Sequence, residues 1–301
     1  MDIKDFKPSD ADRLPTDGFF IYVSSRSGAG KTHLITWLLS LPRFRSKFHA
    51  CLVLSPTSNI GDYKQFEMVS PEYHHSDSKQ IPDILNQIKQ TAKEVRKKHG
   101  IKSKFLVIID DFLTDSRSMG QTNRALNEFV SVRRHYGCAM VMISQRIQAC
   151  SPSIRNQCSM FISFSPRTVD DRTFIVKNFL TRELINNSTK ETLSYANEIL
   201  DTVFSKSPYA ALVVDCIGQS AKMLDNVWSL VAPAKIKKYK LRLKKPRGRG
   251  VNKKLPSDAQ PISAGGMMIK NSPADALSFD VIPTDESASE EEDDVQYLNL
   301  G

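Results

Sequence analysis

Residues 25–32 combine glycines, a lysine and hydroxyls in an order that suits the binding of phosphate groups. The segment is Ser25, Arg26, Ser27, Gly28, Ala29, Gly30, Lys31 and Thr32. Gly28 and Gly30 allow the backbone to approach an anion without a side chain in the way. Lys31 supplies a positive charge for the β- and γ-phosphates, and the Thr32 hydroxyl is a suitable ligand for Mg²⁺. These residue types predict a loop that binds a nucleoside triphosphate.

The segments on either side of this loop support the same prediction. A short apolar run, 19–24, precedes the loop, and an apolar-periodic segment, 33–41, follows it. A P-loop requires this strand–loop–helix context, because the N–H groups of the loop and of the helix N-terminus then face the anion. Ser25 stands where such loops usually have their first glycine. The alternative is a turn that binds nothing, and the flanking elements count against it.

Two carboxylates end the apolar run 104–111. Asp110 and Asp111 follow consecutive apolar residues, which predict a strand buried on both faces of a parallel sheet. At the carboxyl end of a strand beside the P-loop, Asp110 is placed to hold Mg²⁺ and Asp111 to orient or deprotonate the attacking water. Acids also follow strands as helix caps or turn residues. The position, roughly 80 residues after a P-loop, favours hydrolysis.

A glutamine and two arginines form a third set of candidates. The segment 123–137 predicts a helix ending in Arg133 and Arg134, where positive charge is favourable against the helix dipole. The apolar run 139–144 predicts the next strand, and Gln145 follows it. Ligands bind at the carboxyl edge of a parallel sheet, so Gln145 is a candidate sensor of the γ-phosphate or of the water. The alternative for Gln145 is a plain loop residue.

Charge is distributed very unevenly along the 301 residues. Residues 255–301 contain one lysine and ten acids, whereas residues 1–254 contain 41 basic and 23 acidic residues. Residues 235–254 alone hold eleven lysines and arginines and no acid. A basic body with an acidic tail indicates a polyanion partner and a tail that modulates access to it. A solvated stretch or a nuclear-import signal is the alternative reading of the basic segment.

The cysteine content and the lack of long apolar stretches count against a disulfide-bonded, zinc-binding, secreted or membrane-spanning protein. The five cysteines are an odd number without paired spacing, which indicates reduced thiols rather than disulfides or a zinc site. No apolar stretch approaches the ~20 residues that span a bilayer, and the N-terminus lacks the pattern of a signal peptide. We therefore expect an intracellular protein that is not secreted and has no membrane partner.

The predicted fold class is α/β, with a mainly parallel sheet between helices, of the P-loop type. Further strands are expected near 49–55, 158–165 and 209–216, and a helix over 82–100. We predict an N-terminal arm (1–18), an ATPase domain (19–234), a basic segment (235–254) and an acidic tail (255–301). The last sixty or so residues bury too little apolar surface to order themselves.

The ordered set of motifs resembles the FtsK–HerA superfamily of DNA-pumping ATPases, most closely the genome-packaging ATPases of poxviruses, other large DNA viruses and polinton-like elements. The shared features are the P-loop, Ser55-Pro56-Thr57, the Asp110-Asp111 pair, the Arg-His pair before a strand ending in Ser-Gln, Ser153–Asn156, and a late strand ending in Asp215. The resemblance covers about residues 19–232. Asp111 stands where many relatives have glutamate.

The resemblance implies an additional-strand ATPase that uses ATP and Mg²⁺ to drive viral double-stranded DNA into a capsid. Gln145 matches a residue that couples nucleotide state to DNA grip. Arg134 matches an arginine finger that reaches a neighbouring subunit, with Arg133 and Arg155 as alternatives. The implied partners are DNA, a capsid or portal component and further copies in a ring, most often a hexamer. The implied locations are the host nucleus, a cytoplasmic virus factory or the virion.

Several rival functions remain open at this point. A GTPase should carry a base-reading Asn/Thr-Lys-x-Asp motif, and the nearest string, 189–192, lacks the aspartate. A small-molecule kinase has no use for the basic segment. A degenerate P-loop scaffold would not need Lys31, Thr32, Asp110 and Asp111 together. Another additional-strand ATPase, such as a helicase or a phage-assembly motor, is the strongest competitor.

Overall fold

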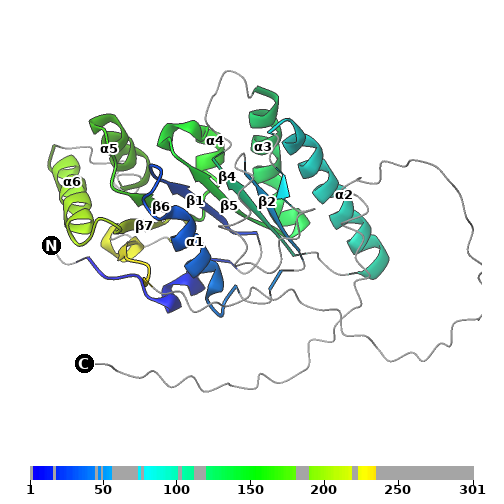
Figure 1. Ribbon diagram of the computed structural model, residues 1–301, viewed down its shortest axis with the longest axis horizontal. Coiled ribbons are helices and arrows are strands. Elements are labelled where there is room, and N and C mark those ends of the chain that lie inside the picture. Colours follow the sequence, from blue (N-terminus) through cyan, green and yellow to red (C-terminus); the bar gives the residue numbers. More distant parts are fainter. Residues whose placement is uncertain are drawn as a thin grey trace, which may run out of the picture.

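The computed structural model describes residues 3–15, 18–44, 47–48, 50–55, 74–75, 78–100, 104–111, 120–180, 190–218 and 223–234. Within these residues one sheet is flanked by helices on both faces (Figure 1). The predicted basic segment and acidic tail lie outside the described residues, as do positions 56 and 57 of the Ser-Pro-Thr motif.

The described part of the sheet has eight strands in the order β3-β2-β4-β5-β1-β6-β7-β8. The strands are β1 (Phe20–Ser24), β2 (Ala50–Leu54), β3 (His74–His75), β4 (Phe105–Asp110), β5 (Cys138–Ser144), β6 (Met160–Phe164), β7 (Ala211–Asp215) and β8 (Val227–Leu230). Neighbours from β3 to β6 pair in parallel, and β7 and β8 are antiparallel. The expected α/β fold with a mainly parallel sheet is confirmed.

The central strands are buried on both faces, as their continuous apolar sequences predict. All residues of β1, β2 and β5 are buried, and in β4 only Asp110 at the carboxyl end is partly exposed. β7 runs against β6, and β8 runs against β7. Residues 216–226, which join β7 to β8, suffice for antiparallel neighbours but are short for a parallel crossover. His74 and His75 form the short edge strand β3 beside β2.

In the part of the chain that the structure describes, six α-helices cover the sheet. They are α1 (Lys31–Ser40), α2 (Ile81–His99), α3 (Gly120–Val132), α4 (Pro152–Arg155), α5 (Val169–Ile175) and α6 (Lys190–Ser205). Apolar side chains of α1 share a core with one face of the sheet, whereas those of α2 to α6 share the core on the other face. Figure 1 shows α2 beside α3 near one end of the sheet and α5 beside α6 near the other.

The N-terminal segment packs on the α1 face of the sheet. Phe6 is buried, its ring meets Trp37 and Trp228 edge to face, and its N–H donates to the carbonyl of Ser229 at 2.8 Å. Leu14, after a short 3₁₀ helix, is fully buried. The predicted arm therefore contributes side chains to the same core as α1.

Two other sequence expectations can be compared with the described residues. All five cysteines carry free thiols and four of them are buried, and burial raises the pKa of Cys51 to about 12. Among the described helices, none is both long enough and apolar enough to cross a bilayer.

Candidate nucleotide-binding site

The loop 25–30 joins β1 to α1 as the sequence predicted. Gly28 and Gly30 have left-handed backbones, with φ of 76° and 92°, and Gly30 is the N-cap residue of α1. These values suit glycine, since a β-carbon is strained in that region. Ser25 is not among the positive-φ residues, and its N–H donates to Ser144 at 3.0 Å, continuing the β1–β5 pairing. The serine at this position therefore costs the loop no backbone strain.

Lys31 lies in the first turn of α1 with its ammonium folded across the loop. Its side chain is buried, and Nζ donates to the carbonyl oxygens of Ser25 and Arg26, each at 3.0 Å. In the part of the chain that the structure describes, no carboxylate forms an ion pair with it. A buried cation held only by carbonyl dipoles creates a field that favours an anion such as a phosphate group.

Strand register brings the two aspartates to the same edge of the sheet as this loop. Ser24 pairs with Ser144, and Asp110 pairs with Ile143, one residue earlier on the same strand, β5. Since β5 alone separates β4 from β1, the aspartates lie about 10 Å from the start of the P-loop. That separation leaves room for phosphate groups and a hydrated cation between them.

Asp111 has a left-handed backbone conformation, and a hydrogen bond orients its side chain. Its φ is 56°, and it is the only described non-glycine residue with positive φ. Its Oδ2 accepts a hydrogen bond from the Gln145 amide at 2.8 Å, whereas its Oδ1 is buried and has no hydrogen-bond partner among the described residues. The structure thus joins two residues that the sequence predicted separately, and leaves one carboxylate oxygen free to accept a proton.

A magnesium ion fits the polar groups at this edge. Among the described residues, no three histidines, cysteines or acids cluster as metal ligands, so an all-protein cage is not formed there. Mg²⁺ usually takes one or two protein oxygens, keeps several waters and binds phosphate oxygens. The Thr32 hydroxyl at the start of α1 and the Asp110 carboxylate at the end of β4 are ligands of that kind.

The three arginines considered as fingers have very different surroundings. Arg133 is completely buried, donates to the carbonyls of Val130 and Gln157, and lies 5.5 Å from the centre of the Phe20 ring. Burial lowers the pKa of Arg133 to about 10, so it stays charged at neutral pH. This environment makes Arg133 a structural residue and not one that reaches another subunit.

Arg134 is exposed, and its side chain runs along Gly18, where an added β-carbon would lie 2.7 Å from Cγ. It precedes the amino end of β5, whereas Gln145 follows the carboxyl end, so the seven-residue strand separates them by about 23 Å. Arg134 is therefore too far to serve the P-loop of its own chain. Arg155 donates to Cys150 and stacks on Phe174, within its own chain.

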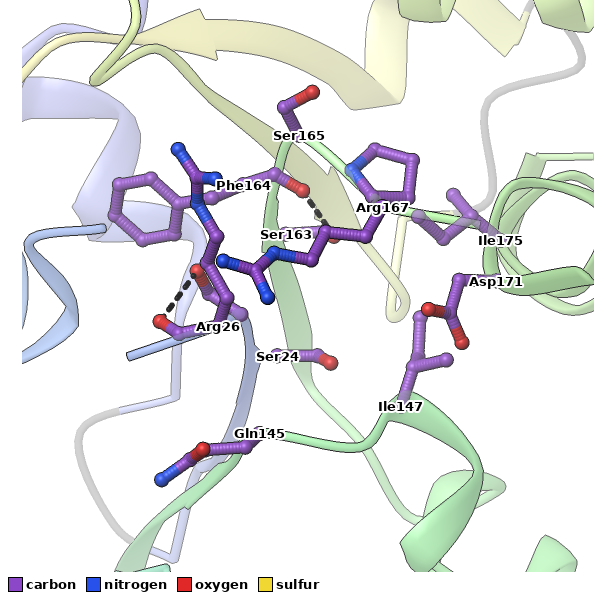
Figure 2. Close-up of a pocket in the computed structure, with 12 residues that line it drawn as sticks. Ser24, Arg26, Gln145, Ile147, Ser163, Phe164, Ser165, Arg167, Asp171 and Ile175 are labelled. Atoms are coloured by element: carbon purple, nitrogen blue, oxygen red, sulfur yellow. Dashed lines mark hydrogen bonds between the residues drawn. The ribbon is translucent and has the colours of Figure 1, made fainter. Parts of the chain in front are cut away.

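Two further residues at the P-loop edge were not identified from the sequence. Tyr209, just before β7, is 60% exposed and its Cδ1 would lie 3.8 Å from a β-carbon on Gly30. Arg167, just after β6, lines a small pocket together with Arg26 and Gln145 (Figure 2). A single exposed aromatic or arginine carries no sequence signal. Arg167 lies at this edge because β6 is parallel to β1, and Tyr209 lies there because β7 is antiparallel to β6.

Asp215 from the late apolar strand lies away from this site. It ends β7 opposite Met160, at the amino end of β6, and its Oδ1 accepts from the N–H groups of Ile217 and Gly218. Arg13 approaches its other oxygen at 3.8 Å. The carboxylate shapes the turn after β7 and is remote from the P-loop.

Two solved structures are similar to this chain. The DNA-packaging ATPase B204 of Sulfolobus turreted icosahedral virus is 16% identical, with a TM-score of 0.47 over 71% of this chain and 97% of that chain. The cytoplasmic domain of the Thermomonospora curvata type VII secretion ATPase EccC is 10% identical, with a TM-score of 0.50 over 71% of this chain and 25% of that chain. At such identities the likeness with EccC shows the fold alone. No curated protein matches the sequence.

The family comparison covers most of the described chain. The poxvirus A32 protein family matches residues 7–227, which include the P-loop, Asp110, Asp111 and Gln145. This match confirms the resemblance to poxvirus-type packaging ATPases that the motifs indicated, and the expected enzyme class with it. The chain belongs to the poxvirus A32 protein family.

Proposed function

We propose that this protein is an ATP-driven translocase that packages viral double-stranded DNA. The observation that carries the proposal is the Asp111–Gln145 hydrogen bond of 2.8 Å at the P-loop edge, within a chain of the A32 family. It links the predicted water-activating carboxylate to the predicted sensor of nucleotide state. Through this contact, a movement of Asp111 during hydrolysis would shift Gln145, and with it the end of β5 and the loop that follows.

The phosphates of ATP would lie along the P-loop, with the terminal phosphate near Lys31. The ammonium has only the Ser25 and Arg26 carbonyls to exchange for phosphate oxygens, so little protein structure must be broken. Thr32 and Asp110 would hold Mg²⁺. When bound, Mg²⁺ neutralises charge that develops on the phosphate oxygens.

Asp111 would receive a proton from the attacking water. Gln145 holds Oδ2, so the buried and unpartnered Oδ1 is the oxygen that faces the water. A carboxylate fixed in this way supplies general-base catalysis without first reorganising. The left-handed backbone of Asp111 is part of the same arrangement, because it turns the side chain at the end of β4.

The base of the nucleotide would stack on Tyr209. The ring lies against Gly30, next to the first turn of α1, where the phosphate chain leaves the loop. The chain after β8 closes the other side, since His33 Nε2 contacts the Pro233 carbonyl at 2.9 Å and Val231 is half exposed. Exposed aromatic and aliphatic surface of this kind suits a purine ring.

The finger residue, the ring and the partners complete the proposal. Arg134 lies at the opposite sheet edge from its own P-loop, which supports action on the nucleotide of the next subunit in a ring, with a hexamer as the expected size. Double-stranded DNA would be the substrate and a capsid or portal component the docking partner. The expected sites of action are the host nucleus, a cytoplasmic virus factory or the virion.

The test is phosphate release by the full chain with MgATP, with and without random-sequence duplex DNA. We expect duplex DNA to stimulate turnover, and Lys31→Ala to remove nucleotide binding or turnover in both conditions. A strand-displacement assay on forked DNA runs in parallel, because unwinding would indicate a helicase. Turnover that ignores duplex DNA would contradict the translocase proposal.

A further inference from the structure

A small pocket opens beside the start of the P-loop, on the side away from Asp111's strand. It is lined by the end of β1 and the P-loop, the segment after β5, the end of β6 with its following loop, and α5 (Figure 2). Its volume is about 60 Å³, which admits a group the size of a few water molecules and not a nucleoside. The pocket thus suits a small polar group and not a base or sugar.

Two guanidinium groups border this pocket. Arg26 belongs to the P-loop and Arg167 to the loop after β6, and both side chains are exposed. Among the described residues, neither guanidinium has a side-chain hydrogen bond or an ion-pair partner. Asp171 is the one carboxylate in the lining, which leaves a net positive charge.

The remaining wall combines hydroxyl, amide and apolar groups. Ser24 and Ser163 are buried serines at the ends of β1 and β6, and Gln145 contributes its amide. Ile147, Phe164 and Ile175 form apolar surface that lowers the local dielectric and strengthens attraction between the arginines and an anion. Guanidinium groups with hydroxyl donors are the usual partners of phosphate oxygens.

The pocket is continuous with the candidate hydrolytic site. Arg26 lines it with its side chain while its carbonyl accepts from Lys31 Nζ. Gln145 lines it while its Nε2 donates to Asp111. A phosphate group in the pocket would therefore lie next to Arg26, whose carbonyl accepts from Lys31, and next to Gln145, which holds Asp111.

We propose that Arg26 and Arg167 form a phosphate-binding pocket in the same chain as the P-loop, which takes a phosphate group at the terminal-phosphate end of the nucleotide. This inference rests on the proposed function, because it deepens the same site. The occupant is either the γ-phosphate of bound ATP or orthophosphate after hydrolysis. Both present the same tetrahedral oxyanion.

The experiment compares Arg167→Ala, Arg167→Lys and Arg26→Ala with the wild-type chain. Arg146→Ala is the matched control, because Arg146 is exposed and adjacent to Gln145 but does not line the pocket. Dissociation constants for ADP and for ATPγS are measured with Mg²⁺ by displacement of a fluorescent nucleotide. Binding of radiolabelled orthophosphate in the presence of ADP is measured by equilibrium dialysis.

If the γ-phosphate occupies the pocket, Arg167→Ala should weaken ATPγS about tenfold and change ADP less than twofold. If released phosphate occupies it, orthophosphate binding should weaken about tenfold while the two nucleotides keep their ratio. Arg167→Lys should lose part of the effect, because it keeps the charge but not the planar fork. Unchanged nucleotide ratio and unchanged orthophosphate binding in both alanine variants would overturn the proposal.

These readouts separate the pocket from the proposed function. A wild-type chain that binds ATPγS through Arg167 but does not hydrolyse ATP would keep the pocket and contradict the ATPase mechanism. If DNA stimulates ATP hydrolysis but the binding constants are the same in the Arg26 and Arg167 variants, the ATPase mechanism stands and the pocket proposal is wrong. Both arginines are exposed, so melting temperatures of the variants should stay close to that of the wild-type chain.

Discussion

Asp111 combines three features that rarely coincide in one residue. Its backbone is left-handed, one carboxylate oxygen is held by Gln145, and the other is buried with no hydrogen-bond partner in the described part of the chain. The left-handed region costs a residue with a side chain about 1 kcal/mol or more, and aspartate tolerates it better than most. Strain and an unpaired buried oxygen at one position are both typical of functional residues.

Asp111→Asn should therefore bind MgATP normally and hydrolyse it at least about 100-fold more slowly, because an amide cannot accept the proton. Binding is followed by fluorescent-nucleotide displacement, and turnover by phosphate release. Glu198→Gln makes the same chemical change at an exposed position on α6 and should leave both values unchanged. If Asp111→Asn hydrolysed ATP at the normal rate, Asp111 would not be the general base.

Tyr209 allows the base and the phosphates to be tested separately. Tyr209→Ala should weaken ATP binding about tenfold, since stacking of a base on an aromatic ring contributes ~1–3 kcal/mol. Inorganic tripolyphosphate has no base, so its competition for the P-loop should be the same in both proteins. Tyr209→Phe keeps the ring and should bind ATP like the wild-type chain. Equal loss of ATP and tripolyphosphate would indicate a damaged loop instead.

At the scale of elements, β5 links the two ends of the predicted mechanism. The 3₁₀ turn Arg133–Tyr136 precedes it, and Gln145 follows it at the P-loop edge. All seven residues of β5 are buried, and the strand pairs in parallel with both β4 and β1. A strand that is hydrogen-bonded on both sides moves as one body. The two arginines before β5 and the glutamine after it therefore belong to one rigid unit.

Replacement by alanine should lower the free energy of unfolding at Arg133 but leave it almost unchanged at Arg134. Arg133→Ala leaves two carbonyls without this hydrogen-bond donor and creates a cavity beside Phe20. We therefore expect the free energy of unfolding to fall by roughly 2–4 kcal/mol. Arg134→Ala is exposed and should change stability by less than about 0.5 kcal/mol. Thermal melts measure both. A stable Arg133→Ala protein would contradict the structural role given to that side chain.

Mixed rings test whether Arg134 acts between subunits. Arg134→Ala and Asp111→Asn proteins should each be inactive, yet a mixture should regain activity at about a quarter of its interfaces, where an intact finger meets an intact base. Mixing is verified by co-purification of differently tagged chains. No recovery in rings shown to be mixed would place the finger elsewhere, and a finger in the same chain would then have to come from the P-loop edge, where Arg167 lies.

At the scale of the whole molecule, positive charge lies in the body and the basic segment, and negative charge in the tail. If residues 235–254 contact DNA, binding should be independent of sequence and should weaken steeply with salt, because each neutralised phosphate releases counterions. The acidic run 285–294 would compete for the same cations as a tethered polyanion. The last described residue is Ala234, and the basic segment begins at the next residue of the sequence.

Truncation separates the contributions of the two tails. A chain ending at Pro283 should bind random-sequence duplex more tightly at moderate salt, and a chain ending at Ala234 should bind it more weakly. Fluorescence anisotropy across a salt series gives affinity and salt slope for both and for the full chain. If both truncations match the full chain, the body alone holds DNA, and nuclear import or capsid docking is left for the basic segment.

The sequence by itself determined the parts of the site whose geometry is local. The P-loop is eight consecutive residues, so glycine positions, a lysine and a threonine suffice to predict its turn, and the structure has left-handed glycines where the pattern requires them. The strands β1, β2, β4, β5, β6 and β7 were equally evident, because burial on both faces demands unbroken apolar runs. The short edge strand β3 and the last strand β8 were not predicted. Asp110, Asp111 and Gln145 could be placed at one edge because parallel strands share their carboxyl ends.

Only the tertiary structure decided which of these residues touch and which arginine is accessible. The Asp111–Gln145 contact spans 34 positions and depends on β4 and β5 being neighbours. Arg133 and Arg134 are adjacent and identical in type, yet packing against Phe20 and Gln157 encloses one and leaves the other in solvent. Arg167 reaches the P-loop because β6 runs parallel to β1, and Tyr209 because β7 runs against β6. The direction of a strand depends on its long-range partner, which no short stretch of sequence encodes.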